Sequence, residues 1–375
     1  MLATSIIGIL IFLYGLILLF YRQGWRKSQH FFTSDHYTPS TRFSIIIAAR
    51  NEAIHIGNCL NSLQQQNYPK SLYEIIVIDD HSEDQTAEVV KQYHNVMLIH
   101  LSDYNNTNTG AYKKQAIALG ISKSSGEYII TTDADCIVPK NWLRCFDQMI
   151  QQNKTSCIAA PVSFQKEKNL LQIFESLDFM MLQGITAAAV QSGIHTMSNG
   201  ANLCYRKSAF EKVGGFSEAD QIASGDDMLL MQKIKQLYPN EIYYCKSKDA
   251  IVITQSSLNI SSFISQRIRW ASKGKYYKEA VLKIILSIVF LLNLAMLGLI
   301  IGSVFSDALF CVTAISVGIK VILEVFFLYP VSTFFGKQRL LWFFIPLQPF
   351  HIVYMVAAAF MGNLTKYHWK GRLVR

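Results

Sequence analysis

The sequence has few charged residues, and its cysteines are not arranged as the disulfide framework that stabilises many small domains. Only 16% of its 375 residues are charged and 51% are hydrophobic, against roughly 25% charged in ordinary soluble domains. Disordered, collagen-like and coiled-coil chains are excluded, because each needs far more charge, more Gly and Pro, or a heptad repeat. The 7 cysteines are scattered and never spaced as C-x-x-C, which argues against structural zinc and favours packed thiols in a reducing cytoplasm.

Several catalytic motifs are absent as well. The sequence has no G-x-G-x-x-G after its first predicted strand, no Walker A loop, no H-E-x-x-H and no G-x-S-x-G. Dinucleotide, P-loop, zinc-protease and serine-hydrolase chemistry therefore lack their usual residues. The net charge of +9 would suit a membrane-surface protein that binds nucleic acid, but part of that charge lies beside apolar runs, where membrane topology explains it. We expect no nucleic-acid partner.

Long apolar runs are present near both ends of the chain. Leu2–Tyr21 carries no charge and is long enough to cross the ~30 Å hydrocarbon core of a bilayer. A signal peptide is the alternative, but no basic residues precede the run and no A-x-A site follows it. We expect residues 1–22 to be an uncleaved transmembrane anchor, because Arg22, Arg26 and Lys27 would hold the next domain in the cytoplasm.

Two further runs of spanning length lie in the C-terminal part. Ile284–Phe305 and Ala308–Tyr329 are separated by a very short turn at Asp307 and predict a helical hairpin. Lys320 and Glu324 lie at i,i+4 spacing in the second run. Ionisable groups inside a span usually pair or mark a functional path, and we interpret these two as a pair that faces neighbouring helices.

The last apolar run, Leu340–Met361, contains Pro346 and Pro349, which interrupt a regular helix. It predicts either a kinked span or a re-entrant segment, and re-entry would keep the basic tail of residues 364–375 in the cytoplasm. We therefore assign residues 279–363 to membrane helices of a multi-pass inner-membrane protein, with both topologies open.

Residues 42–278 have the composition of a soluble, cytoplasmic domain. Helical stretches begin near Ala53, Asp84, Lys113 and Lys140. They alternate with apolar runs that predict strands at Phe43–Ala48, Glu74–Ile78, Val96–His100 and Glu127–Thr131. This alternation predicts right-handed βαβ units in an α/β domain with a mostly parallel sheet. Ligands of such sheets bind beyond the carboxyl ends of the strands, and polar residues follow three of the four runs.

Carboxylates at these strand ends are candidate ligands. Alternation would place Asp133 and Asp135 on one side of their strand, and their oxygens suit Mg²⁺ or Mn²⁺ together with substrate phosphates. A solvated, helix-capping turn is the alternative. One aspartate of the Asp79-Asp80 pair could hydrogen-bond a base or ribose while its neighbour caps the next helix, and capping alone is the simpler interpretation.

Two later motifs could complete a site. Asp226 and Asp227 open an amphipathic stretch, where a carboxylate is electrostatically favoured at a helix start; the functional alternative is that Asp227 is a general base. Gln266 and Arg269 share a helix face, and Trp270 follows. Guanidinium binds phosphate and indole stacks on sugars or lipids, although an interfacial Trp/Arg belt is the simpler interpretation.

Taken in order, these motifs resemble those of membrane-bound family-2 glycosyltransferases, which have a GT-A fold. The matching segments are Ser44-Ile45-Ile46-Ile47-Ala48-Ala49-Arg50-Asn51-Glu52, Val77-Ile78-Asp79-Asp80, Lys113 with Ala116, Asp133-Ala134-Asp135, Asn199-Gly200-Ala201-Asn202, Gly214-Gly215-Phe216, Gly225-Asp226-Asp227 and Gln266-Arg267-Ile268-Arg269-Trp270. Each is common alone, whereas the ordered set is specific.

The resemblance implies a role for each matching position. The nucleotide pocket would be lined by Ala48, Glu52, Asp80 and Lys113. The donor diphosphate would be held, through Mg²⁺ or Mn²⁺, by Asp133 and Asp135. The general base would be Asp227. Four further residues would cover the donor diphosphate and border the acceptor, namely Asp226, Gln266, Arg269 and Trp270. Of these, Arg269 would contact the diphosphate.

The implied function is inverting, metal-dependent hexosyl transfer. The donor would be a cytoplasmic nucleotide-diphospho-sugar, with UDP the commonest nucleotide in such families, and the acceptor a hydroxyl of a membrane lipid or lipid-linked glycan. A processive synthase of exopolysaccharide or poly-N-acetylglucosamine type is the main alternative, although few spans are predicted for a polymer channel. A non-catalytic membrane partner with the same fold is the third hypothesis.

Overall fold

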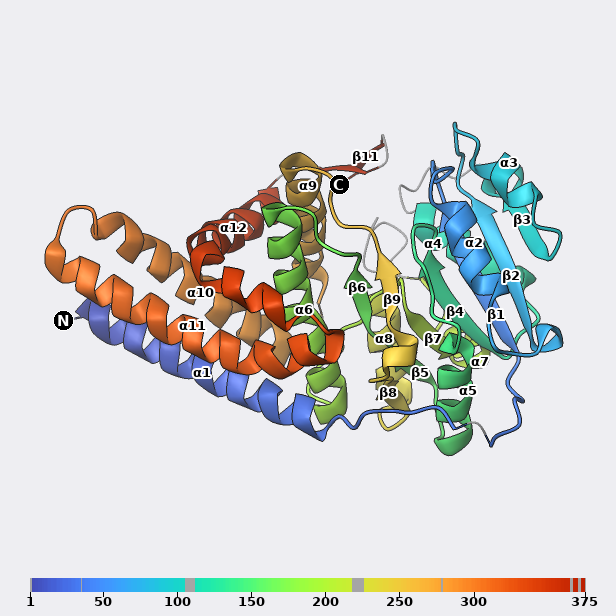
Figure 1. Ribbon diagram of the computed structural model, residues 1–375, viewed down its shortest axis with the longest axis horizontal. Coiled ribbons are helices and arrows are strands. Elements are labelled where there is room, and N and C mark those ends of the chain that lie inside the picture. The colour runs from blue at the N-terminus through green and yellow to red at the C-terminus, as the bar shows by residue number, and fades with distance from the viewer. Residues whose placement is uncertain are drawn as a thin grey trace. The chain divides into compact units, whose positions relative to one another are not determined.

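The computed structural model describes residues 2–34, 36–104, 112–217, 226–277, 279–364, 367–369 and 372–374 (Figure 1). They form two compact units, a sheet unit and a helical unit. The sheet unit comprises Ser28–Gln165, Thr196–Gln255 and His368–Arg375. The helical unit comprises Met1–Lys27, Lys166–His195 and Ser256–Tyr367. The domain limits expected from the sequence stay predictions, and Lys366, Lys370 and Arg375 of the basic tail lie outside the described residues.

The sheet unit alternates strands with helices. Its strands are β1 Phe43–Ala49, β2 Tyr73–Asp79, β3 Val96–His100, β4 Tyr128–Asp133, β5 Cys157–Ala159, β6 Val162–Phe164, β7 Leu203–Arg206, β8 Ile242–Tyr244 and β9 Val252–Thr254. Its helices are α2 Ile56–Gln64, α3 Thr86–Lys91, α4 Tyr112–Lys123, α5 Trp142–Gln152, α7 Lys207–Lys212 and α8 Asp226–Leu237. Near the end of the chain β10 Tyr367–Trp369 pairs with β11 Arg372–Val374.

The main sheet is mixed and mostly parallel, which confirms the predicted fold class. Its strand order is β3-β2-β1-β4-β7-β5-β8. β1 pairs in parallel with β2 and β4, and β2 pairs in parallel with β3. β7 is antiparallel to both β4 and β5, and β5 is parallel to β8. β6 and β9 form a separate parallel pair.

The strand order reverses at β1. The chain first adds β2 and β3 on one side of β1 and then returns to place β4 on the other side. The parallel register sets Ala48 opposite Asp133 and Ala49 opposite Asp79, so the three strands end at one edge. Open α/β sheets bind ligands in the crevice outside such a reversal. The topology therefore singles out the edge beyond β1 and β4.

Helix α4 packs closely on this part of the sheet because it carries a glycine. A Cβ at Gly120 would lie 2.6 Å from Cγ2 of the fully buried Ile46 on β1, closer than van der Waals contact allows. Glycine alone avoids this clash. The close approach brings the first turn of α4, with Lys113, to the carboxyl end of β4.

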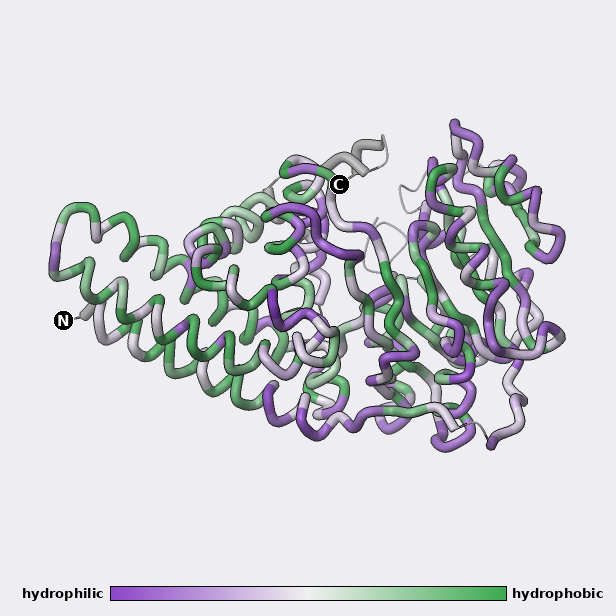
Figure 2. The backbone as a smooth tube through the Cα atoms, viewed as in Figure 1, coloured by the Kyte–Doolittle hydropathy of each residue, from purple (hydrophilic) through white to green (hydrophobic). Residues whose placement is uncertain are grey.

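The helical unit is built mainly from long apolar helices, with one shorter amphipathic helix, α9. Its helices are α1 Leu2–Lys27, α6 Leu170–Ser192, α9 Ile260–Ala271, α10 Ala280–Gly302, α11 Asp307–Phe335 and α12 Phe344–Leu364. In the described part of the chain 5 helices are long and apolar enough to cross a membrane, namely all of these except α9. Figure 2 shows α1, α10 and α11 as mostly hydrophobic along their length.

Helix α6 is a fifth candidate span that the sequence analysis does not predict. Its mean hydropathy is 1.3, against 2.3, 2.8 and 2.1 for α1, α10 and α11. Glu175 and Asp178 lower this value, but both are paired within the helical unit. Glu175 accepts hydrogen bonds from the backbone N–H and hydroxyl of Ser257 at 2.8 and 2.9 Å, and Asp178 pairs with Arg267 at 3.0 Å. Periodicity alone cannot show partners so distant in sequence.

The prolines of the last apolar run do not end its helix. A 3₁₀ segment at Gln338–Phe343 leads into α12, which continues through Pro346 and Pro349. Pro346 falls in the first turn, where a backbone N–H has no intrahelical partner and proline is tolerated. Crossing and re-entry both stay predictions for this segment.

A polar cluster lies among the apolar helices. Lys320 Nζ lies 2.7 Å from Glu324 Oε1 and 2.9 Å from Gln348 Oε1, and both charged side chains are at most 2% exposed. Gln348 Nε2 donates to Glu324 Oε2 at 2.8 Å, and the Tyr14 hydroxyl donates to Glu324 Oε1 at 2.6 Å. The expected Lys320–Glu324 pair is confirmed, and residues of α1 and α12 complete it.

We predict that Lys320→Met destabilises the protein more than Lys320→Met combined with Glu324→Met. The single substitution leaves a carboxylate buried without its cation, which costs roughly 3–5 kcal/mol, whereas removing both charges is much less costly. Thermal unfolding of detergent-solubilised protein measures this, with Lys283→Met at an exposed position of α10 as control. Equal losses in the single and double variants would contradict the prediction.

Candidate active site

The predicted site residues of the sheet unit lie at the carboxyl edge of its parallel strands. Every residue of β1 and β4 is buried except Ala48 and Asp133, and these two are register partners. Neighbouring strands lie about 4.8 Å apart, so the two half-buried residues form one opening. This opening coincides with the reversal of strand order.

The D-x-D carboxylates are held in place by hydrogen bonds from elsewhere in the unit. Asp133 Oδ1 accepts a bond from Lys113 Nζ at 2.6 Å, and Asp135 Oδ2 accepts one from the Thr254 hydroxyl at 3.0 Å. Strand alternation, the basis of the prediction, does not extend to Asp135, because β4 ends at Asp133. A tight turn, closed by the Cys136 N–H on the Asp133 carbonyl at 3.1 Å, carries the second carboxylate.

A buried thiol lies beside the D-x-D turn. Cys59 of α2 is fully buried, and its Sγ lies 3.7 Å from the Asp133 carbonyl oxygen. Burial raises the pKa of the Cys59 thiol, and the charges of Asp135, Asp133 and Glu52 raise it further. No motif singles out Cys59, whose proximity becomes visible only in the fold.

A hydrogen-bonded clamp joins the loop after β1 to the loop after β2. Arg50 Nη1 donates to the carbonyl oxygens of Asp80 and His81 at 3.0 and 2.5 Å, and its Nη2 lies 2.9 Å from Glu83 Oε1. Arg50 and Asp80 are 7% and 2% exposed. The clamp fixes Asp80 at the carboxyl end of β2. The sequence analysis includes Arg50 in a motif but assigns it no function.

Asp227 lies at the start of α8, and both of its carboxylate oxygens accept backbone hydrogen bonds. Oδ2 accepts from the Gly200 N–H at 2.9 Å, and Oδ1 accepts from the Met228 N–H at 2.8 Å. The first bond ties α8 to the Asn199-Gly200-Ala201-Asn202 segment. A carboxylate with a fixed orientation results, as a general base requires.

The segment that holds Asp227 is anchored by a buried asparagine. Asn202 Nδ2 donates to the carbonyl oxygens of Pro161 and Ala250 at 2.7 and 2.8 Å, and its Oδ1 accepts from Trp142 Nε1 at 2.9 Å. Asn202 is fully buried, so the loss of any of these bonds would leave an unsatisfied polar group. The motif was visible in the sequence, but this anchoring role was not.

Strand register places Asp227 at the same edge as the D-x-D turn. β7 is antiparallel to β4, with Leu203 at its start opposite Thr131 near the end of β4. The loop that precedes β7 therefore lies beside the residues that follow Thr131, which include Asp133. Because Gly200 of that loop binds Asp227, the sheet unit gathers its predicted carboxylates at one edge.

The other predicted residues lie in the helical unit or are not fully described. Gln266, Arg269 and Trp270 lie on α9 and are each half-buried. Gly225 lies outside the described residues, and only the backbone of Asp226, the first residue of α8, is described. The roles of Gln266, Arg269, Trp270 and Asp226 stay predictions, as do those of the carboxylates in the sheet unit.

Arg267 is a structural residue of α9 that the sequence analysis does not single out. Its Nη1 lies 3.0 Å from Asp178 Oδ2 on α6, and the residue is 2% exposed. Its guanidinium lies 4.2 Å from the ring centroid of Trp270 and 5.0 Å from that of Phe263. Cation–π contacts of this kind orient the ring, so Arg267 fixes α9 on α6 and supports Trp270.

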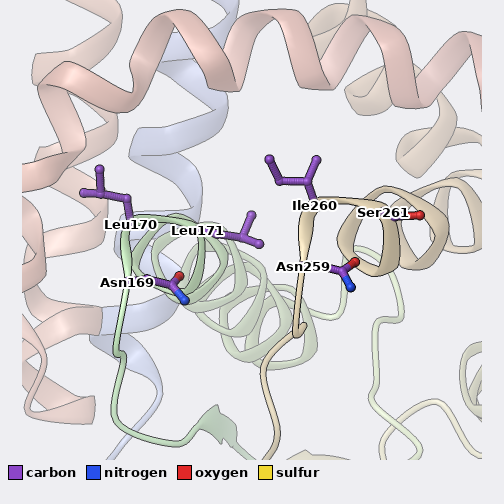
Figure 3. A pocket seen from close by; sticks show the side chains of 6 residues that line it. All are labelled: Asn169, Leu170, Leu171, Asn259, Ile260 and Ser261. Carbon is purple, nitrogen blue, oxygen red and sulfur yellow. The ribbon is translucent and has the colours of Figure 1, made fainter.

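The first turns of α6 and α9 border an apolar depression of about 880 Å³. Figure 3 shows its lining residues, which are Asn169, Leu170, Leu171, Asn259, Ile260 and Ser261. The two asparagines cap the helices, and each accepts a backbone N–H bond. Leu170 and Ile260 are 59% and 62% exposed and point to the same side (Figure 3). The helical unit therefore presents apolar surface at this point.

The D-x-D turn fits a hard divalent cation that is shared with a phosphate ligand. Mg²⁺ and Mn²⁺ take one or two protein carboxylates and complete their coordination with water and substrate phosphates. Asp133 and Asp135 supply two half-buried carboxylates on one turn. Within the described ranges no group of three or more His, Cys, Asp or Glu side chains could hold a metal. A cation here would complete its coordination with water or with phosphate oxygens.

We predict that Arg50→Lys lowers the free energy of unfolding by roughly 1–3 kcal/mol, because an ammonium cannot satisfy two loop carbonyls in the planar geometry of guanidinium. Glu83→Gln should change stability little, because this partner is 79% exposed and surface ion pairs contribute weakly. Thermal unfolding of both variants distinguishes the two contributions. A larger loss in Glu83→Gln than in Arg50→Lys would show that the exposed ion pair, not the carbonyl clamp, stabilises the loops.

Comparisons with known proteins agree with this geometry. Residues 44–214 match the family model described as Glycosyl transferase family 2. The chain is 26% identical over 237 residues to the poly-beta-1,6-N-acetyl-D-glucosamine synthase of Staphylococcus epidermidis, covering 62% of this chain and 54% of that protein. It is 27% identical over 240 residues to the beta-monoglucosyldiacylglycerol synthase of Trichormus variabilis, covering 62% and 48%. The chain thus spans about half the length of these relatives.

A solved structure supports the fold along nearly the whole chain. The mannosyltransferase PcManGT of Pyrobaculum calidifontis, solved in complex with GDP-Man and Mn²⁺, superposes with a TM-score of 0.61 at 18% identity, covering 96% of this chain and 98% of that one. At this identity the likeness is one of fold. Residues 44–214 therefore resemble a glycosyl transferase family 2 domain and have a GT-A-like fold, in a chain whose relatives are glycosyltransferases.

Proposed function

We propose that this protein is a membrane-bound, metal-dependent, inverting glycosyltransferase that moves a sugar from a nucleotide-diphospho-sugar to a hydroxyl of a lipid or lipid-linked acceptor. The observation that carries the proposal is the gathering of Asp80, Asp133 and Asp227 at the edge where the strand order reverses. Three carboxylates at one sheet edge suit a substrate that carries a diphosphate, a nucleoside and an attacking hydroxyl.

The donor site would use the residues around β1 and β4. Lys113 and the D-x-D carboxylates would surround the diphosphate, with Asp135 as the more direct metal ligand and Asp133 oriented by Lys113 at 2.6 Å. A bound Mg²⁺ or Mn²⁺ would neutralise charge on the leaving diphosphate. The PcManGT structure, which contains GDP-Man and Mn²⁺, supports this type of donor complex.

The acceptor would be activated by Asp227. A general base must reach the hydroxyl proton with a fixed orientation, and two backbone N–H groups orient this carboxylate. Proton removal lets the acceptor oxygen attack the anomeric carbon from the face opposite the diphosphate. One displacement inverts the anomeric configuration, so no covalent nucleophile is needed. Gln266, Arg269 and Trp270 would cover the diphosphate and border the acceptor.

The helical unit favours a lipid acceptor. Its apolar helices suit a bilayer, and the depression at Leu170 and Ile260 offers apolar surface to acyl or isoprenoid chains. The relative named as a glucosyldiacylglycerol synthase supports this choice. The relative named as a poly-N-acetylglucosamine synthase supports polysaccharide synthesis as the second candidate. Because nucleotide sugars are made in the cytoplasm, the active face would lie on that side of the inner membrane.

We predict that Asp227→Asn lowers sugar transfer by at least about 100-fold while nucleotide binding persists, since loss of a general base removes proton transfer but not the donor site. The assay measures nucleoside diphosphate release by detergent-solubilised protein with Mn²⁺, a panel of donor sugars and native lipid extract. Glu211→Gln, at an exposed acid of α7 in the same unit, is the matched control and should be fully active.

The outcomes separate the hypotheses. Release that depends on lipid extract and yields a single glycolipid supports the proposal, whereas a ladder of polymer supports the second candidate. Full activity of Asp227→Asn would refute the assigned base. If no donor supports release in the wild-type protein, the chain is a non-catalytic partner with a transferase fold.

A further inference from the structure

Two residues other than glycine have a left-handed backbone conformation in the described part of the chain. They are Asn51, with φ of 51°, in the loop after β1, and His81, with φ of 54°, in the loop after β2. This conformation is uncommon for residues other than glycine, although asparagine and histidine adopt it more often than most. Glycine would fit the backbone at position 81 without strain.

The surrounding loop imposes this conformation on His81. Arg50 Nη1 binds the His81 carbonyl oxygen at 2.5 Å, and the Ser82 N–H donates to Asp79 Oδ1 at 3.2 Å. The Asn51 N–H donates to the Ser82 hydroxyl at 3.0 Å. Hydrogen bonds to the His81 carbonyl oxygen and from the Ser82 N–H thus hold the backbone beside residue 81. None of these bonds involves an atom of the imidazole.

The conformation directs the imidazole to the carboxyl edge of the sheet. His81 Nδ1 lies 3.0 Å from Asp80 Oδ1, and the ring centroid lies 6.2 Å from that of Tyr112, at an interplanar angle of 77°. The His81 side chain is 40% exposed, whereas that of Asp80 is 3% exposed. The buried carboxylate therefore orients the ring, and part of the ring stays accessible to a ligand.

The positions of the other carboxylates determine the direction in which a bound donor nucleotide would extend across the sheet edge. Under the proposed function the sugar lies between the D-x-D turn after β4 and Asp227, which is tied to the loop before β7. The nucleoside must then extend the opposite way, across β1 toward β2. β2 is two strand spacings from β4, about 10 Å, which leaves room for a ribose between the diphosphate and His81.

We propose that His81 is a specificity-determining residue that packs its imidazole, with Tyr112 beside it, against the nucleobase of the donor. This inference rests on the proposed function, since it requires a nucleoside diphosphate at this edge. Aromatic rings bind bases through their faces, and an imidazole fixed by a buried carboxylate is pre-organised for such contact. The uncommon backbone conformation that presents this ring at the sheet edge is then explained by its ligand.

The test is His81→Gly, measured by calorimetric titration of the solubilised full chain with Mn²⁺ and UDP, GDP, ADP, CDP or inorganic pyrophosphate. Pyrophosphate has no base, so its affinity should not change. The preferred nucleoside diphosphate should bind about tenfold more weakly than to wild type, and the preference among the four should shrink. His81→Gly also removes the hydrogen-bond partner of the buried Asp80 Oδ1, so its thermal midpoint is measured first to show that the variant is folded. Asn51→Gly, at the other left-handed position, is the matched control and should keep nucleotide affinity.

A second variant separates the effect of losing the imidazole ring from the effect of changing the backbone conformation. His81→Asn tolerates the left-handed conformation but lacks the ring, so it should lose nucleotide affinity as His81→Gly does. Unchanged nucleotide binding in both variants would overturn the inference and leave the proposed function intact. An equal loss of pyrophosphate affinity would also overturn it, because His81 would then only shape the loop. A wild-type protein that binds none of the four nucleotides would refute the proposed function itself, and this inference with it.

Discussion

The parallel pairing of β1 with both β2 and β4 is the constraint on which the rest of the sheet unit depends. Main-chain hydrogen bonds in a buried parallel sheet admit one register, because a one-residue slip would move every side chain to the opposite face. That register sets Ala48 opposite Asp133 and Ala49 opposite Asp79. Residues more than eighty positions apart in the chain therefore end at one edge without any direct attraction between them. Carboxylates that repel one another need such a scaffold to stay together.

The loops beyond that edge fix the orientation of the carboxylates that the sheet brings close together. Each carboxylate is held by a donor from another element: Asp133 by Lys113, Asp135 by Thr254 and Asp227 by Gly200. Such bonds stabilise an arrangement of like charges that would otherwise be unfavourable, and they leave its geometry set before a substrate arrives. Pre-organisation of this kind is the main way in which enzymes stabilise developing charge. The left-handed conformation of His81 belongs to the same set of fixed loops.

Much of the fold could be predicted because it follows from local pattern, whereas most roles in the candidate site come from the resemblance and stay predictions. The apolar runs that form β1 to β4 are short and bounded by polar residues, and the acidic motifs come directly after them. The unpredicted features depend on partners far apart in sequence. Helix α6 was missed because Glu175 and Asp178 make it look polar, and their partners, Ser257 through hydrogen bonds and Arg267 through an ion pair, become visible only in the fold. The anchoring by Asn202, the clamp by Arg50 and the turn that carries Asp135 likewise exist only once the tertiary structure forms.

Binding of Mn²⁺ observed by electron paramagnetic resonance tests the central claim most directly, since the signal of free Mn²⁺ disappears on binding. Two half-buried carboxylates on one turn hold a cation well only when a diphosphate completes its coordination. The wild-type protein should therefore bind Mn²⁺ tightly with a nucleoside diphosphate and weakly without it, and Asp133→Asn and Asp135→Asn should both abolish the tight binding. Tight binding that needs no nucleotide, or that survives in both variants, would show that the strand-reversal edge is not the donor site.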